Sequence, residues 1–148
     1  REAESGRLLL PKQGRFDVAA SILRTADRLR SESDHELALE VLMPPNLPRV
    51  TGTAVVFERA LLQLLRRRLA ESLPGKPLTL LARALGGEAA HSVMVSVADV
   101  PEAERRGSTG HPPEAVAQAI QAMGGDVVCV EDSLVGRVTA LRLPVAGR

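Results

Sequence analysis

The run Arg66-Arg67-Arg68 is the part of the sequence best suited to bind phosphate. A guanidinium offers a planar fork of donors and a permanent positive charge, so it can replace a metal ion beside a phosphate. A run of charges on a helix is also typical of a solvated face. The residues alone leave both interpretations open.

The other reactive side chains suggest no further chemistry. His35, His91 and His111 are scattered without the spacing of metal ligands, so no metal site is predicted. Cys129 alternates inward on an apolar strand, which favours a buried, inert thiol, and a single cysteine excludes an internal disulfide. The carboxylates form no convergent pair, and no nucleophile–base triad is visible. No catalytic residue is therefore assigned.

Composition restricts the class of protein. The 148 residues suit one domain, and a net charge of +1 gives no global field that favours nucleic acid or a membrane surface. The only aromatic residues are Phe16 and Phe57, so a platform for stacking bases is excluded. No apolar run approaches the roughly 20 residues that span a bilayer, and no signal peptide opens the chain. We expect a cytoplasmic module that binds no nucleic acid and does not insert into a membrane.

Periodicity predicts three helices. Phe57, Leu61, Leu64, Leu65 and Leu69 form a buried stripe on the second of them. In the first, an apolar face is expected to contain Phe16, Ala19, Ala20, Leu23, Ala26 and Leu29. Proline near the start of the third helix is harmless, and double glycine ends it. The predicted ranges are Phe16–Ser31, Ala54–Leu73 and Pro113–Met123.

Alternating apolar residues predict five strands, two of which are joined at Gly86-Gly87 as a hairpin. Prolines at 44–48 and the mixed stretch Val100–Pro113 are expected to form loops. The order of elements predicts an α/β (α+β) two-layer sandwich, in which three helices cover a mixed, largely antiparallel sheet. The predicted strands are Glu36–Met43, Leu78–Leu85, Ser92–Ala98, Val127–Glu131 and Arg137–Pro144.

Several segments, in their order and spacing, resemble the catalytic and ATP-binding domain of sensor histidine kinases, the Bergerat fold of the GHKL ATPases. They are VTGTAVVFERALLQLL with PGKPLTLLAR, HELALEVLMPPNLPRVTGT, SVMVSVADV, and GHPPEAVAQAIQAMGGDVVCVEDSLVGRVTALRLP. The opening REAESGRLLLPKQGRFDV resembles the stretch that follows the dimerisation and phosphoacceptor domain in that family. The resemblance implies a linker over residues 1–15, after a helix that this chain lacks, and an ATPase-type domain over residues 16–148.

The resemblance also implies a vestigial nucleotide site. Gln63 and Arg67 fall on the two asparagine positions of the family's N box, and Arg67 on the position that coordinates the metal. A guanidinium has no lone pair for Mg²⁺, which requires oxygen ligands. Asp99 falls on the aspartate that accepts a hydrogen bond from the adenine amino group.

The glycines of that site are partly replaced. Pro101 and Ala103 stand where two glycines follow the adenine-binding aspartate, and a proline fixes φ and removes a donor. Gly110 of the second glycine motif remains, but Pro112 replaces another glycine near the start of a helix. That motif normally presents backbone N–H groups to phosphate.

From these changes we expect a divergent domain impaired in ATP binding, which acts as a regulatory or scaffold module of a pseudokinase or phosphotransferase in two-component signalling. No cofactor or metal is expected. The implied partners are the dimerisation and phosphoacceptor domain of the same parent, and a response regulator or partner kinase. One alternative is an active domain that uses ATP and Mg²⁺ to phosphorylate a histidine on a preceding helical domain. Another is an anti-sigma-type protein-binding switch. The isolated chain is expected to be a monomer.

Overall fold

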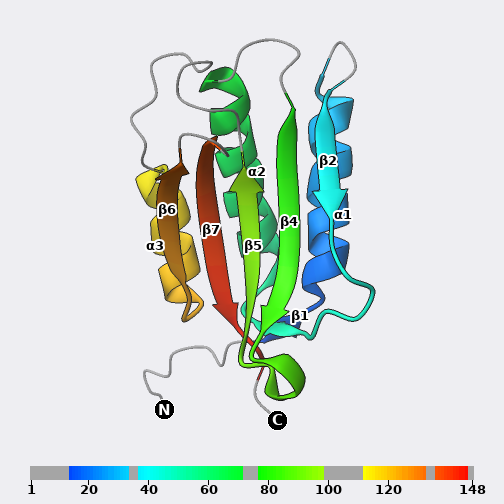
Figure 1. Cartoon of the computed structure of the whole chain (residues 1–148), viewed down its shortest axis with the longest axis vertical. Helices are drawn as coiled ribbons and strands as arrows, with labels where there is room; N and C mark the ends of the chain where they lie inside the picture. The colour runs from blue at the N-terminus through cyan, green and yellow to red at the C-terminus, as the bar shows by residue number, and fades with distance from the viewer. Residues whose placement is uncertain (1–13, 34–36, 72–76, 99–111, 133–135, 147–148) are drawn as a thin grey trace, which may run out of the picture.

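In the part of the chain that the structure describes, three helices cover one face of a five-stranded sheet, and none of them lies on the other face (Figure 1). The computed structural model describes residues 14–33, 37–71, 77–98, 112–132 and 136–146. The helices are α1 (Val18–Ser31), α2 (Ala54–Glu71) and α3 (Glu114–Ala122), with a 3₁₀ turn at Gly87–Ala89. The strands are β1 (Arg15–Phe16), β2 (Leu39–Leu42), β3 (Val50–Thr51), β4 (Leu78–Leu85), β5 (Ser92–Ala98), β6 (Asp126–Asp132) and β7 (Gly136–Pro144).

The main sheet has the strand order β2-β4-β5-β7-β6. β2 and β4 are parallel, and the other neighbouring pairs are antiparallel. The register places Val97 of β5 opposite Thr139 of β7, and Thr139 opposite Cys129 of β6. This architecture confirms the predicted two-layer sandwich with a mixed, largely antiparallel sheet.

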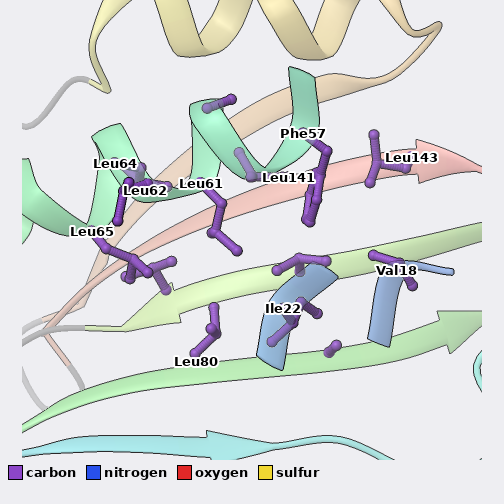
Figure 2. Close-up of a cluster of buried hydrophobic side chains, with 14 of the residues drawn as sticks. Val18, Ile22, Phe57, Leu61, Leu62, Leu64, Leu65, Leu80, Leu141 and Leu143 are labelled. Atoms are coloured by element: carbon purple, nitrogen blue, oxygen red, sulfur yellow. The ribbon is translucent and has the colours of Figure 1, made fainter. Parts of the chain in front are cut away.

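The core lies between the helices and the sheet (Figure 2). Side chains of α1 and α2 meet inward-facing residues of β4 and β7, and the rings of Phe16 and Phe57 pack at 5.4 Å between centroids. Aliphatic side chains fill most of this space, as the low aromatic content predicts. The labelled core residues are Val18, Ile22, Phe57, Leu61, Leu62, Leu64, Leu65, Leu80, Leu141 and Leu143.

Two predictions about the first helix are wrong: its start and the burial of Leu23. The helix begins at Val18 because the Asp17 side chain accepts a hydrogen bond from the backbone N–H of Ala20 at 3.1 Å, which caps the helix. Phe16 instead lies in β1, which pairs with β3 in a two-residue ladder that we had not predicted. Leu23, placed on the apolar face by periodicity, is 49% exposed. The buried residues of α1 are Val18, Ser21, Ile22, Thr25, Ala26 and Leu29.

Most other boundaries agree closely with the sequence, but β2 is shorter than predicted. It spans Leu39–Leu42 within the predicted Glu36–Met43, of which residue 36 lies outside the described part. β4 and β5 have the predicted ends, and α2 starts at Ala54 and is described to Glu71; residues 72 and 73 of the predicted helix lie outside the described part. α3 stops at a double glycine in which Gly124 has φ +86°, a conformation that favours glycine. A Cβ on Gly125 would overlap the carbonyl oxygen of Arg142, so β7 can lie this close only to a glycine. Among the described residues, no helix is both long and apolar enough to cross a membrane.

Candidate functional site

The predicted site residues are divided between described and undescribed parts of the chain. Asp99 and Gly110 lie outside the described residues, as do Pro101 and Ala103. Their predicted roles therefore stay predictions. Gln63 and Arg67 lie on α2, and the geometry around this helix can be followed directly.

Gln63 and Arg67 are both exposed, and their spacing of four residues places them along one side of α2. Arg67 Nε donates a hydrogen bond to Glu71 Oε2 at 3.1 Å, one turn further along the helix. Gln63 lies on the side of α2 that faces α1, where it lines a groove together with Arg66. Along this polar stripe Gln63 offers one oxygen ligand and Arg67 offers none, so the pair does not fit a Mg²⁺ site.

The interpretation of the three arginines as one solvated helix face is wrong for Arg68. Arg66 and Arg67 are exposed, but the Arg68 side chain is 1% exposed. It donates to Glu71 Oε1 at 3.1 Å and to Thr139 Oγ1 at 2.8 Å. The sequence contained a signal for this burial, since Arg68 follows Leu61 by seven residues and therefore continues the apolar stripe.

Glu71 is the centre of a buried ion cluster, which we define as Arg68, Glu71, Arg137 and Thr139. Glu71 Oε1 accepts a hydrogen bond from Arg137 Nη2 as well as the one from Arg68, and the Arg137 side chain has no exposed surface. Sequence reasoning missed this cluster, because its members come from α2 and β7 and are separated by as many as 71 positions. No local sequence pattern predicts the contacts between these two elements.

The cluster keeps its carboxylate ionised. Burial alone raises the pKa of Glu71, but hydrogen bonds from Arg137 and Arg67 and the charges of Arg137 and Arg68 outweigh burial, so the pKa is lowered. The cluster lies beneath the C-terminal half of α2, close to the end of β5, because Thr139 pairs with Val97. Asp99 follows β5 directly in the sequence.

The start of α3 is poorly equipped to hold an anion. Pro112 and Pro113 precede the helix, so two positions there have no backbone N–H. Pro113 occupies the N-cap without a side-chain hydrogen bond, and Glu114 puts a negative charge in the first turn. A carboxylate at this end already interacts favourably with the helix dipole and repels a phosphate.

The described residues contain no metal site. No group of three or more His, Cys, Asp or Glu side chains in this part of the chain is placed to hold an ion. His91 is exposed, whereas His35 and His111 lie outside the described residues. Cys129 points inward as predicted but is half-buried, because it lies on the edge strand β6, and its Sγ is 3.8 Å from Thr139 Oγ1.

Comparison with solved structures gives the fold. The chain is similar to the mycobacterial sensor histidine kinase MprB, with a TM-score of 0.70 and 19% identity over 92% of this chain and 99% of that one. It is also similar to the Acinetobacter baumannii histidine kinase AdeS, with a TM-score of 0.71 and 14% identity over 94% of this chain and 70% of that one. The chain is also similar to the catalytic domain of histidine kinase ThkA, with a TM-score of 0.67 and 13% identity over 93% of this chain and 99% of that one. No protein-family model and no curated protein sequence matches the chain.

These similarities confirm the predicted fold. Their identities are below 20%, so they show the shared fold and not a shared activity. The chain has the fold of the catalytic domain of sensor histidine kinases.

Proposed function

We propose that this chain is a divergent histidine kinase-like ATPase domain of a two-component signalling protein, impaired in ATP binding, which acts as a regulatory or scaffold module. Its partners would be a dimerisation and phosphoacceptor domain of the same parent and a response regulator or partner kinase. The parent would work in the cytoplasm or present this domain there. The fold supports the class of protein, and the side chains of α2 support the loss of nucleotide.

The proposal depends chiefly on Arg67. The resemblance puts Arg67 at the position that coordinates the metal, where an oxygen ligand is required. Its guanidinium is bound to Glu71, and Glu71 is itself held by Arg68 and Arg137. Turning Arg67 toward a phosphate would give up its bond to Glu71. A surrogate role for Arg67 at the phosphates is therefore disfavoured.

The start of α3 supports the same conclusion independently. In the family, backbone N–H groups before this helix receive phosphate, but here Pro112 and Pro113 supply none. Glu114 adds a like charge next to the place that a phosphate would occupy. Two separate elements therefore disfavour a bound nucleotide.

A nucleotide titration tests the proposal. The purified chain is titrated with a fluorescent ATP analogue, with and without Mg²⁺, and compared with Asp99→Asn and with Asp126→Asn as a matched control on β6. We expect no saturable binding up to millimolar nucleotide in any of the three proteins. Arg67→Asn alone should not restore binding, because the prolines remain.

One result would overturn the proposal, and a second would correct the cause that it assigns. Micromolar affinity that is lost in Asp99→Asn and retained in Asp126→Asn would support the alternative, an active ATP-binding catalytic domain. Recovery of binding by Arg67→Asn alone would show that the replaced glycines matter little and that Arg67 is the whole obstacle.

A further inference from the structure

A groove of about 560 Å³ runs between α1 and α2 on their exposed side. Thr25 and Leu62, both nearly buried, form its floor, and Val55 is an exposed apolar residue at one end. The remaining lining is polar and mostly basic: Arg24, Arg28, Glu58, Arg59, Gln63 and Arg66.

Hydrogen bonds join the two helices across the groove. Glu58 Oε2 accepts bonds from Ser21 Oγ at 2.7 Å and from Arg24 Nη2 at 2.7 Å. Eight residues further along both helices, Arg66 Nε donates to Glu32 Oε1 at 3.0 Å. Eight residues correspond to about 12 Å of helix, so the walls are tied at two separated points. A preformed groove costs a ligand less ordering than a flexible surface.

The groove has a net positive charge. Four arginines line it against the single carboxylate of Glu58, and including Glu32 at its end still leaves two positive charges in excess. Within the described part of the chain, Arg59 forms no ion pair or hydrogen bond through its side chain. An uncommitted arginine beside apolar groups is a typical anchor for a partner's carboxylate.

The spacing of the charges indicates the kind of ligand. Arg59 and Arg66 are seven residues apart, about 10 Å along the helix, so their positions match two separated anionic groups of one ligand. Acidic residues two turns apart on a helix have a matching separation. An apolar side chain between them would reach Leu62, and one beyond them would reach Val55. We propose that the groove binds an acidic amphipathic helix of a partner protein. The proposal does not depend on whether the domain binds nucleotide.

The test uses the full chain and a synthetic helical peptide of about 16 residues, with leucines along one face and glutamates on both sides of it. Fluorescence anisotropy should give saturable, micromolar binding at low salt. Arg59→Glu should weaken this binding by roughly tenfold or more, and Val55→Ser should weaken it by a smaller factor. Circular dichroism checks that each variant is folded.

Arg83→Glu is the matched control, because it makes the same change of charge at an exposed position on β4. We expect it to leave the affinity nearly unchanged. The proposal is overturned if the peptide shows no saturable binding up to millimolar concentration. It is also overturned if Arg59→Glu and Arg83→Glu weaken binding equally, or if single-stranded DNA of the same charge binds as tightly as the peptide, because each result would indicate an unspecific response to charge.

Discussion

Arg66 and Arg68 are two residues apart on α2, yet they occupy opposite environments. Two residues turn a helix by about 200°, so the side chains leave on nearly opposite sides. Arg66 is 49% exposed and pairs with Glu32 across the groove, whereas Arg68 is 1% exposed and pairs with Glu71. Water competes for the first pair and has little access to the second. The position around the helix therefore decides what an arginine does, and the following predictions measure this difference.

The largest effect is expected for Glu71→Ala. This change removes the carboxylate that accepts hydrogen bonds from the buried guanidinium groups of Arg68 and Arg137, which costs about 3–5 kcal/mol in the free energy of unfolding. Urea denaturation followed by circular dichroism measures it. Glu40→Ala, at an exposed position on β2, is the control and should change little. Similar stability of Glu71→Ala and the unchanged protein would mean that the ion cluster contributes nothing.

A smaller effect is expected at acid pH. Because the folded-state pKa of Glu71 is lowered, the unfolded chain binds more protons as the pH falls below about 4.5, the ordinary value for a glutamate. This contribution to stability is therefore complete above the unfolded pKa and is lost as the pH falls through the folded one.

Urea denaturation at several pH values between acidic and neutral tests whether the stability contributed by Glu71 is lost as the pH falls. Glu71→Gln should be less stable at neutral pH, and its stability should fall less steeply below about pH 4.5 than that of the unchanged protein. Glu58, whose pKa is also lowered, titrates in both proteins, so their difference isolates Glu71. Parallel pH profiles would show that another carboxylate is responsible.

The smallest effect is expected for Arg66→Ala. Its partner Glu32 lies at the surface, so removing the ion pair should change the midpoint of urea denaturation only slightly. High salt should remove even this difference, because it screens exposed charges. A loss as large as that of Glu71→Ala would mean that α1 depends on this contact for its position, and the contrast between the two arginines would disappear.

The sequence predicted the elements well where the signal is local. The ends of β4 and β5 follow from alternating apolar residues around Gly86 and Gly87, and the end of α3 follows from Gly124. Periodicity also identified the stripe of α2, in which Leu69 is half-buried and the other four residues are buried. It failed for Leu23, because hydrophobicity alone does not show which side of α1 meets the sheet.

The candidate site was predictable only in part. Gln63 and Arg67 were found on one side of α2, and Glu71 lies four residues after Arg67, within reach on the same helix. The groove beside Gln63 could not be predicted from these spacings. The groove requires α1 to lie against α2, and its tie through Glu32 and Arg66 joins residues 34 positions apart.

The sequence by itself determined the two-layer α/β class and the composition of the core, because each element carries its own pattern of buried and exposed residues. The bonds from Arg67 and Arg68 to Glu71 also lie within one helix, at spacings of four and three residues. Tertiary structure alone decided the other contacts: Arg66 pairs with Glu32 of the segment after α1, and Arg137 and Thr139 of β7 complete the cluster around Arg68 and Glu71. These contacts join residues far apart in the sequence, and packing α2 against α1 and the sheet sets their distances.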